Sequence, residues 1–240
     1  MTEPASVPAR PVKPGLVRRL ARNPFVNLVA AFLVLALVQT FLVRLYSVPS
    51  GSMEQTLEVG DRILVNRLAY LGSEPTTGDV VVFDASEAWD GEVPPESNPL
   101  KAAVRWLGGV IGIGPSDRHT LVKRIIAGPG QTVSCCDAEG RVLVDGSPLD
   151  EPYVFEDLPF EAGVLDCASV PVSQRCFAEY TVPEGSYLAL GDHRSASSDS
   201  IAHCRGTPTT TDDCVRLVRR DDIVGEVFQI VFPFSRWSGI

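Results

Sequence analysis

Two serines flank a glycine in the segment VPSGSMEQTL, residues 48–57, directly after a long apolar run. A serine hydroxyl attacks a peptide or ester carbonyl only if a base accepts its proton. The segment contains no histidine, so the base would have to come from elsewhere in the chain. The residues are therefore either a structural turn or part of a nucleophilic site.

Three histidines are candidate bases, namely His119, His193 and His203. Their number permits a Ser–His–Asp triad, but the chain has no GxSxG motif, the sharp turn that presents the serine in one large class of such hydrolases. A lone histidine in a polar loop is usually a solvated side chain. The histidines are the weaker candidates.

A lysine can also act as the base, provided that its amine is neutral. Burial among apolar side chains lowers the pKa of a lysine, because desolvation penalises the ammonium form. Lys123 lies in TLVKRIIAGPG, an apolar, strand-like segment that ends in a Gly-Pro turn, whereas Lys101 lies in a polar loop and Lys13 precedes the apolar run. Lysines on strands usually face solvent, so this pattern is weak evidence by itself.

A third stretch, LALGDHRSASSDS (188–200), runs from an apolar segment into a Gly-Asp turn and a cluster of hydroxyls and carboxylates. Such a cluster is most often a polar loop that hydrogen-bonds to its own backbone. Taken singly, the stretches favour structural roles. Their combination and order, after an apolar anchor, favour a catalytic site.

The first element that would position these residues is the apolar run PFVNLVAAFLVLALVQTFLV, Pro24–Val43, which has no charged residue. As a helix it would span about 30 Å, the thickness of the hydrocarbon core of a bilayer. The alternatives are a buried soluble helix and a cleaved signal peptide, whose apolar region is usually only about 7–15 residues long. We predict an uncleaved transmembrane anchor over residues 24–45.

The charge distribution predicts the orientation of this anchor. Residues 1–23 hold five basic residues and one acidic residue, and we expect a disordered cytoplasmic tail. By the positive-inside rule, residues 46–240 then lie outside the cell (plasma) membrane. The whole chain has a net charge of −9, so the body is acidic, which argues against nucleic-acid binding.

The remaining chain is rich in strand-like segments bounded by Gly, Pro or Asp. We expect a mainly β protein, with an antiparallel β catalytic domain formed by residues 46–134 and 180–240. A smaller β and loop subdomain, the cap, is expected at residues 135–179 and would be pinned by disulfides. The Gly-rich apolar stretch at residues 104–114 is either a core turn or a surface that contacts lipid.

All six cysteines follow the anchor, which suits an oxidising compartment. Six cysteines allow fifteen pairings. We prefer the two pairs that close short loops, Cys167–Cys176 and Cys204–Cys214, with Cys135 and Cys136 remaining. A zinc site is the competing interpretation, but the chain has no CxxC pair, so we expect no metal.

Together, these stretches resemble the type I (leader) signal peptidases, membrane-anchored serine proteases with a Ser–Lys dyad. The matching motifs are PSGSMEQTL (49–57), GDVVVF (78–83), VKRIIAGPG (122–130) and GDHRSASSDS (191–200). The resemblance implies removal of signal peptides from exported preproteins, with cleavage after small residues at positions −1 and −3. It implies no cofactor, and it implies preproteins, the lipid bilayer and, as a further candidate, the protein export machinery as partners.

The resemblance also implies roles for individual residues. Ser52 matches the nucleophile and Lys123 the general base, so activity should rise with pH as the lysine loses its proton. Ser50 and the backbone N–H of Ser52 match the oxyanion hole, and an extended segment would place Ser50 and Ser52 on one face. Ser197 matches the serine that orients the lysine amine. Structural support is implied for Arg124, Asp192 and Asp199, and substrate pockets are implied at Val48, Pro49, Met53, Leu57 and Val122.

Three positions depart from the family pattern. Gln55 replaces a usual proline, His193 a common asparagine, and Ile201 an arginine that commonly pairs with the carboxylate at Asp199. Arg205 is a candidate replacement for that arginine. Two rival functions are a self-cleaving Ser–Lys regulator of the repressor type, which would be cytosolic, and a membrane-tethered β domain that only binds partners.

Overall fold

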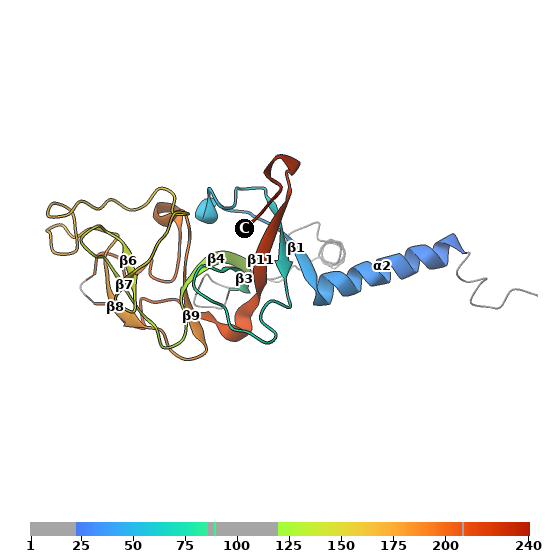
Figure 1. The fold of residues 1–240 in the computed structure, drawn as a ribbon, viewed down its shortest axis with the longest axis horizontal. Helices are drawn as coiled ribbons and strands as arrows, with labels where there is room; N and C mark the ends of the chain where they lie inside the picture. The colour runs from blue at the N-terminus through green and yellow to red at the C-terminus, as the bar shows by residue number, and fades with distance from the viewer. Residues whose placement is uncertain (1–22, 86–88, 90–119, 208) are drawn as a thin grey trace, which may run out of the picture.

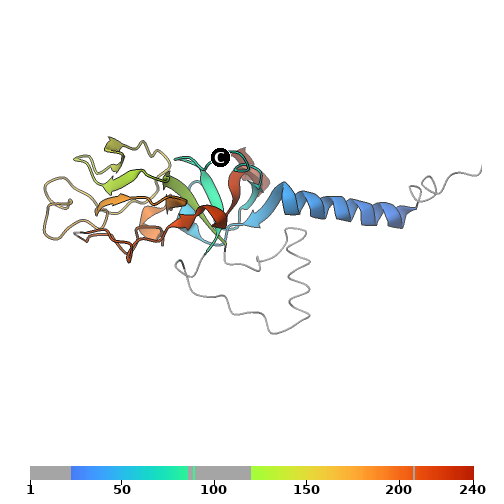
Figure 2. The same cartoon turned by 90° about the horizontal axis from the view of Figure 1, so that it is seen from below.

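The computed structural model describes residues 23–85, 89, 120–207 and 209–240. The predicted tail up to residue 22, the stretch 104–114, Lys101 and His119 lie outside the described residues. Helix α2 projects from one end of a β body, and a small sheet lies at the opposite end (Figures 1 and 2). Strand β4, which carries Lys123, lies between these two ends.

Helix α2, Pro24–Phe41, begins with a proline and is capped by Asn23, whose side chain accepts a hydrogen bond from the Phe25 N–H. Proline fits the first turn because N–H groups there have no helical partners. The helix buries none of its side chains, and it is long and apolar enough to cross a membrane. It is shorter than the predicted anchor over residues 24–45, because strand β1, Val43–Ser47, begins two residues after it.

An antiparallel sheet forms most of the body, in the strand order β1-β2-β11-β3-β4-β9-β10, with β12 paired to β11. Besides β1, its strands are β2 (Arg62–Asn66), β3 (Val80–Asp84), β4 (Thr120–Ala127), β9 (Ser186–Leu190), β10 (Val218–Arg219), β11 (Ile223–Phe232) and β12 (Ser238–Gly239). The 3-10 helices are η1 (Gly51–Met53), η2 (Arg194–Ala196), η3 (Arg220–Asp222) and η4 (Phe234–Arg236). The prediction of a mainly antiparallel β fold is confirmed.

A second sheet has the order β7-β6-β5-β8 and consists of β5 (Thr132–Cys135), β6 (Val142–Val144), β7 (Ser147–Pro148) and β8 (Phe177–Thr181). It extends beyond both ends of the predicted cap, residues 135–179. Val133 and Phe177 of this sheet pack in one apolar cluster with Leu188 of β9. Because the two sheets share this core, the small sheet packs against the large sheet instead of around a core of its own.

Another apolar cluster lies under the segment that carries Ser52. Met53 and Leu57 of that segment pack with Ile63 and Val65 of β2. All four side chains are buried, and burial of each side chain of this size contributes roughly 2 kcal/mol. The core therefore anchors the chain immediately after Ser52.

Three disulfides link the cysteines. The preferred pairs Cys167–Cys176 and Cys204–Cys214 are confirmed, and Cys135 is bonded to its neighbour Cys136. The sulfurs of Cys136, Cys167 and Cys176 lie within 4.8 Å of one another. They belong to disulfides, however, whereas zinc binds cysteines as thiolates.

Candidate active site

The candidate nucleophile lies on a tight turn. Ser50 is extended, but η1 begins at Gly51, and the Glu54 N–H donates to the Gly51 carbonyl at 3.0 Å. The segment is therefore not extended through Ser52, so the alignment of Ser50 and Ser52 expected for an extended segment does not apply. Ser50 is exposed and Ser52 is half-buried.

Lys123 approaches this turn from the middle of the large sheet. It lies on β4 opposite Val81 of β3, and β9 flanks β4 on the other side. Only 3 % of Lys123 is exposed, and its Nζ lies 2.6 Å from the Ser52 Oγ, a hydrogen bond between residues that are distant in the sequence. A hydroxyl and an amine in this arrangement can act as nucleophile and base.

Ser197 does not meet the role that the resemblance implies. Its Oγ is buried and makes no hydrogen bond to the residues that the structure describes. Its side chain packs against Gly191 instead, so that a Cβ at residue 191 would lie 2.2 Å from the Ser197 Oγ. The same Cβ would lie 2.5 Å from the Ser52 carbonyl oxygen. Only glycine at position 191 therefore lets the loop lie directly on the nucleophile turn.

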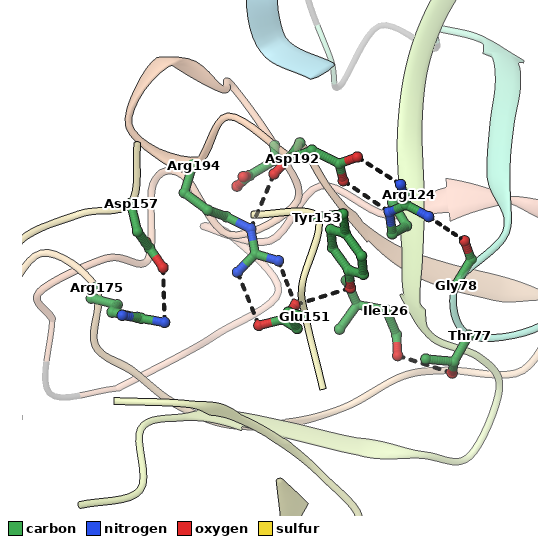
Figure 3. A network of polar contacts seen from close by, with 12 residues as sticks. Thr77, Gly78, Arg124, Ile126, Glu151, Tyr153, Asp157, Arg175, Asp192 and Arg194 are labelled. Carbon is green, nitrogen blue, oxygen red and sulfur yellow. Dashed lines mark hydrogen bonds and ion pairs between the residues drawn. The ribbon is translucent and has the colours of Figure 1, made fainter. Parts of the chain in front are cut away.

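Arg124, the residue after Lys123, forms a two-pronged ion pair with Asp192 (Figure 3). Its Nε and Nη2 donate to the two carboxylate oxygens at 2.9 and 2.7 Å. The Thr56 hydroxyl donates to the same carboxylate at 2.6 Å, and the Arg124 Nη1 donates to the Gly78 carbonyl at 2.7 Å. The pair therefore ties β4 to the loop after β9 and to the segment that follows Ser52.

A second group of residues extends this network into the cap (Figure 3). The Arg124 guanidinium lies 3.9 Å from the ring centre of Tyr153, and the Tyr153 hydroxyl donates to Glu151 at 3.2 Å. Burial, with the charge of Glu151, raises the pKa of Tyr153, so the phenol keeps its proton. Glu151 also pairs with Arg194, whose Nε donates to the Gly191 carbonyl at 3.0 Å.

Burial by itself would lower the pKa of Arg194, but Glu151 outweighs it and raises that pKa, so the guanidinium stays charged. Sequence reasoning missed Glu151, Tyr153 and Arg194. The first two lie in a polar, proline-containing segment of the cap, and Arg194 was quoted within a motif without a role. The spacing of these three residues in the sequence matches no functional motif, because their partners come from other parts of the chain.

The partner of Asp199 is Arg205. The Arg205 Nη2 lies 3.1 and 3.4 Å from the two carboxylate oxygens of Asp199, which is fully buried. Ile201 is fully buried in the apolar cluster shared by the two sheets. Arg205 therefore replaces the arginine that position 201 lacks, and it does so next to the Cys204–Cys214 disulfide.

Most of the residues suggested for substrate pockets contribute to the core. Val48, Met53 and Leu57 are buried in the cluster under the nucleophile turn, with Val122 packed against it and partly accessible. Pro49 is exposed. A pocket of 380 Å³ lies in the small-sheet region between Arg141 and Arg175, and its lining contains none of the predicted site residues.

The histidines do not supply a base to Ser52 among the residues that the structure describes. The His193 ring hydrogen-bonds to Gly51 and Glu54 and lies 3.3 Å from the Glu156 carboxylate, and His203 is exposed. Gln55 has a φ of 76°, a left-handed conformation that the proline ring does not allow. The turn therefore differs from one that carries the usual proline of the family.

Comparison with known proteins extends these observations. A family model described as "Signal peptidase, peptidase S26" matches residues 21–232. Signal peptidase I of Mycobacterium tuberculosis (strain ATCC 25618 / H37Rv) is 38 % identical over 238 residues, which cover 95 % of this chain and 77 % of the relative. Signal peptidase I of Leptolyngbya laminosa is 30 % identical over 94 % of this chain and 89 % of its own length. The chain therefore belongs to the signal peptidase family, peptidase S26, and is a serine endopeptidase that removes signal peptides from preproteins.

Proposed function

We propose that this signal peptidase cleaves by a dyad in which Ser52 is the nucleophile and Lys123 the general base. The observation that carries the proposal is the 2.6 Å contact between the Lys123 Nζ and the Ser52 Oγ. Burial of Lys123 supports it, because removal from water disfavours the ammonium form and a neutral amine can accept the serine proton. No group other than the two side chains is needed for this step.

The reaction then proceeds in two stages. Ser52 attacks the scissile carbonyl while Lys123 takes its proton, and the peptide C–N bond breaks as Lys123 returns that proton to the leaving amine. Water, activated by the same amine, releases the peptide acyl group from Ser52. The Ser52 N–H and the Ser50 hydroxyl stabilise the oxyanion, and one such donor typically contributes about 3 kcal/mol.

The packing around the dyad supports cleavage after small residues. Val48, Met53 and Leu57 are buried in the core beneath the turn, and Val122, beside Lys123, packs against this core and stays partly accessible. We expect the accessible surface at Val122 to accept alanine-sized side chains at positions −1 and −3 and to reject larger ones. Asp192, Arg124 and Asp199 support the site without contacting the substrate.

Helix α2 and the disulfides support a location in the plasma membrane with the β body outside it. The exposed apolar helix would anchor the chain in the plasma membrane and the lipid bilayer, with the N-terminus cytoplasmic and the β body outside. The three disulfides support an oxidising, extracytoplasmic compartment. Preproteins would then reach Ser52 near the bilayer surface, during or after passage through the export machinery.

The test is cleavage of a precursor with an Ala-x-Ala site by the full chain in detergent. We expect Ser52→Ala and Lys123→Ala to lose about a thousandfold or more in kcat. Ser195→Ala, at an exposed serine in the adjacent loop, is the matched control and should cleave like the wild type. A variant of either dyad residue that folds and retains the wild-type rate would remove that residue from the mechanism.

A further inference from the structure

The ring of His193 lies against the nucleophile turn. Its Nδ1 is 3.2 Å from the Gly51 carbonyl and 3.0 Å from the Glu54 carboxylate, and its Nε2 is 3.3 Å from the Glu156 carboxylate. Its backbone N–H donates to the carbonyl of Ser52 itself at 3.2 Å. His193 therefore contacts the residues before, at and after the nucleophile.

Every group that faces the ring nitrogens is a hydrogen-bond acceptor. A neutral imidazole carries one N–H, so one of its nitrogens would face a carboxylate or carbonyl oxygen without a proton between them. The doubly protonated imidazolium carries an N–H on each nitrogen and a positive charge, so it can form ion pairs with both carboxylates. The two carboxylates therefore form ion pairs with the ring only when His193 is charged.

The cap places Glu156 for this contact. Phe155 pairs with the loop of His193 through hydrogen bonds with Asp192 and Arg194, and its ring meets the imidazole edge-on at 5.1 Å. Glu156 follows with a φ of 39°, an uncommon conformation for a residue with a side chain. Its backbone carbonyl accepts from the Ser195 N–H, so the segment is fixed on both sides of the carboxylate.

We propose that doubly protonated His193 is a positioning residue. Its ring lies between Glu54 and Glu156 and so holds the turn Gly51–Met53 in place. The inference rests on the proposed Ser52–Lys123 dyad. In it, the positive charge of His193 keeps the Ser52 Oγ within hydrogen-bond distance of the Lys123 amine. The titratable groups that face the ring are Glu54 from the turn and Glu156 from the cap. On the loop of His193, Asp192 and Arg194 engage Arg124 and Glu151 instead.

The proposal predicts opposing effects of pH. Rising pH removes a proton from Lys123, which increases activity, and removes a proton from His193, which loosens the turn. Dividing the wild-type kcat by that of His193→Asn cancels the ionisation of Lys123, because both enzymes contain it. The ratio therefore reports His193 alone.

The experiment measures kcat and KM from about pH 5 to about pH 10, with the full chain in detergent. At low pH we expect the wild-type kcat to be about ten times that of His193→Asn, because a misplaced reacting group lowers the rate. As the pH rises, this ratio should fall towards one through a single ionisation. KM should stay within about twofold, because the turn positions the nucleophile rather than the substrate. His203→Asn, at an exposed histidine, is the control and should give a ratio of one throughout.

A ratio that does not change with pH would overturn the proposal. Glu156→Gln provides a second test that leaves the imidazole in place, and the Glu156 side chain is 64 % exposed, so the fold should tolerate the change. Without this negative charge, the fall of the kcat ratio should occur at a lower pH than with Glu156 present. A fall at the same pH would also overturn the proposal. These outcomes are distinct from failure of the dyad, which would appear as activity in Lys123→Ala.

Discussion

The two partners of the proposed dyad are held in different ways. Lys123 lies in the middle of β4, where it pairs with Val81 of β3, and the next residue, Arg124, pairs with Leu190 of β9. Ser52 lies on a three-residue turn and is held by contacts with Gly191 and His193, which come from a distant loop. Apart from Lys123 itself, changes around β4 should therefore affect mainly the fold, and changes around the turn should affect mainly catalysis.

The largest expected effect is on the β4 side. Arg124→Ala leaves the buried Asp192 without its ion pair, which should lower the free energy of unfolding by about 3–5 kcal/mol. Urea unfolding in detergent measures this change. Arg219→Ala is the control, because its side chain is exposed and 4.0 Å from Asp222, and it should change stability by less than about 0.5 kcal/mol. Equal stabilities of the two variants would contradict the comparison.

The next effect is on the turn side. Gly191→Ala places a Cβ 2.5 Å from the Ser52 carbonyl oxygen, so the turn must move away from Lys123. We expect kcat to fall about a hundredfold while far-UV circular dichroism stays that of the wild type. Gly72→Ala is the matched control, because a Cβ at Gly72 meets no atom within 4 Å. A Gly191→Ala enzyme with the wild-type kcat would show that the turn tolerates displacement.

The smallest expected effect concerns the backbone conformation of Gln55, which follows the nucleophile turn. Gln55 has a φ of 76°, so Gln55→Gly should raise the free energy of unfolding by up to about 1 kcal/mol. Gln55→Pro, which introduces the usual residue of the family, should lower both stability and kcat because proline cannot adopt this φ. Ser195→Gly, at an ordinary backbone conformation, should destabilise slightly. Stabilisation by Gln55→Pro would mean that the turn adopts another conformation.

Much of the fold was predictable because local sequence carries the physical signal. An uncharged run as long as a bilayer is thick indicates the helix α2, although its end was placed too late because β1 begins with Val43, which still belongs to that run. β-branched segments between turn residues indicate the sheet. The shared core of the two sheets was not predictable, since strand patterns do not say which strands pack together.

The sequence by itself determined which residues could react: two serines around a glycine, one lysine among apolar neighbours and a Gly-Asp loop. The tertiary structure decided how they are supported. It pairs Asp199 with Arg205, leaves the Ser197 Oγ without a hydrogen bond to the described residues, and places Tyr153 against Arg124. A local motif shows only the type and spacing of neighbouring residues. These contacts join segments that meet only when the chain packs its apolar side chains, so no short stretch of sequence reveals them.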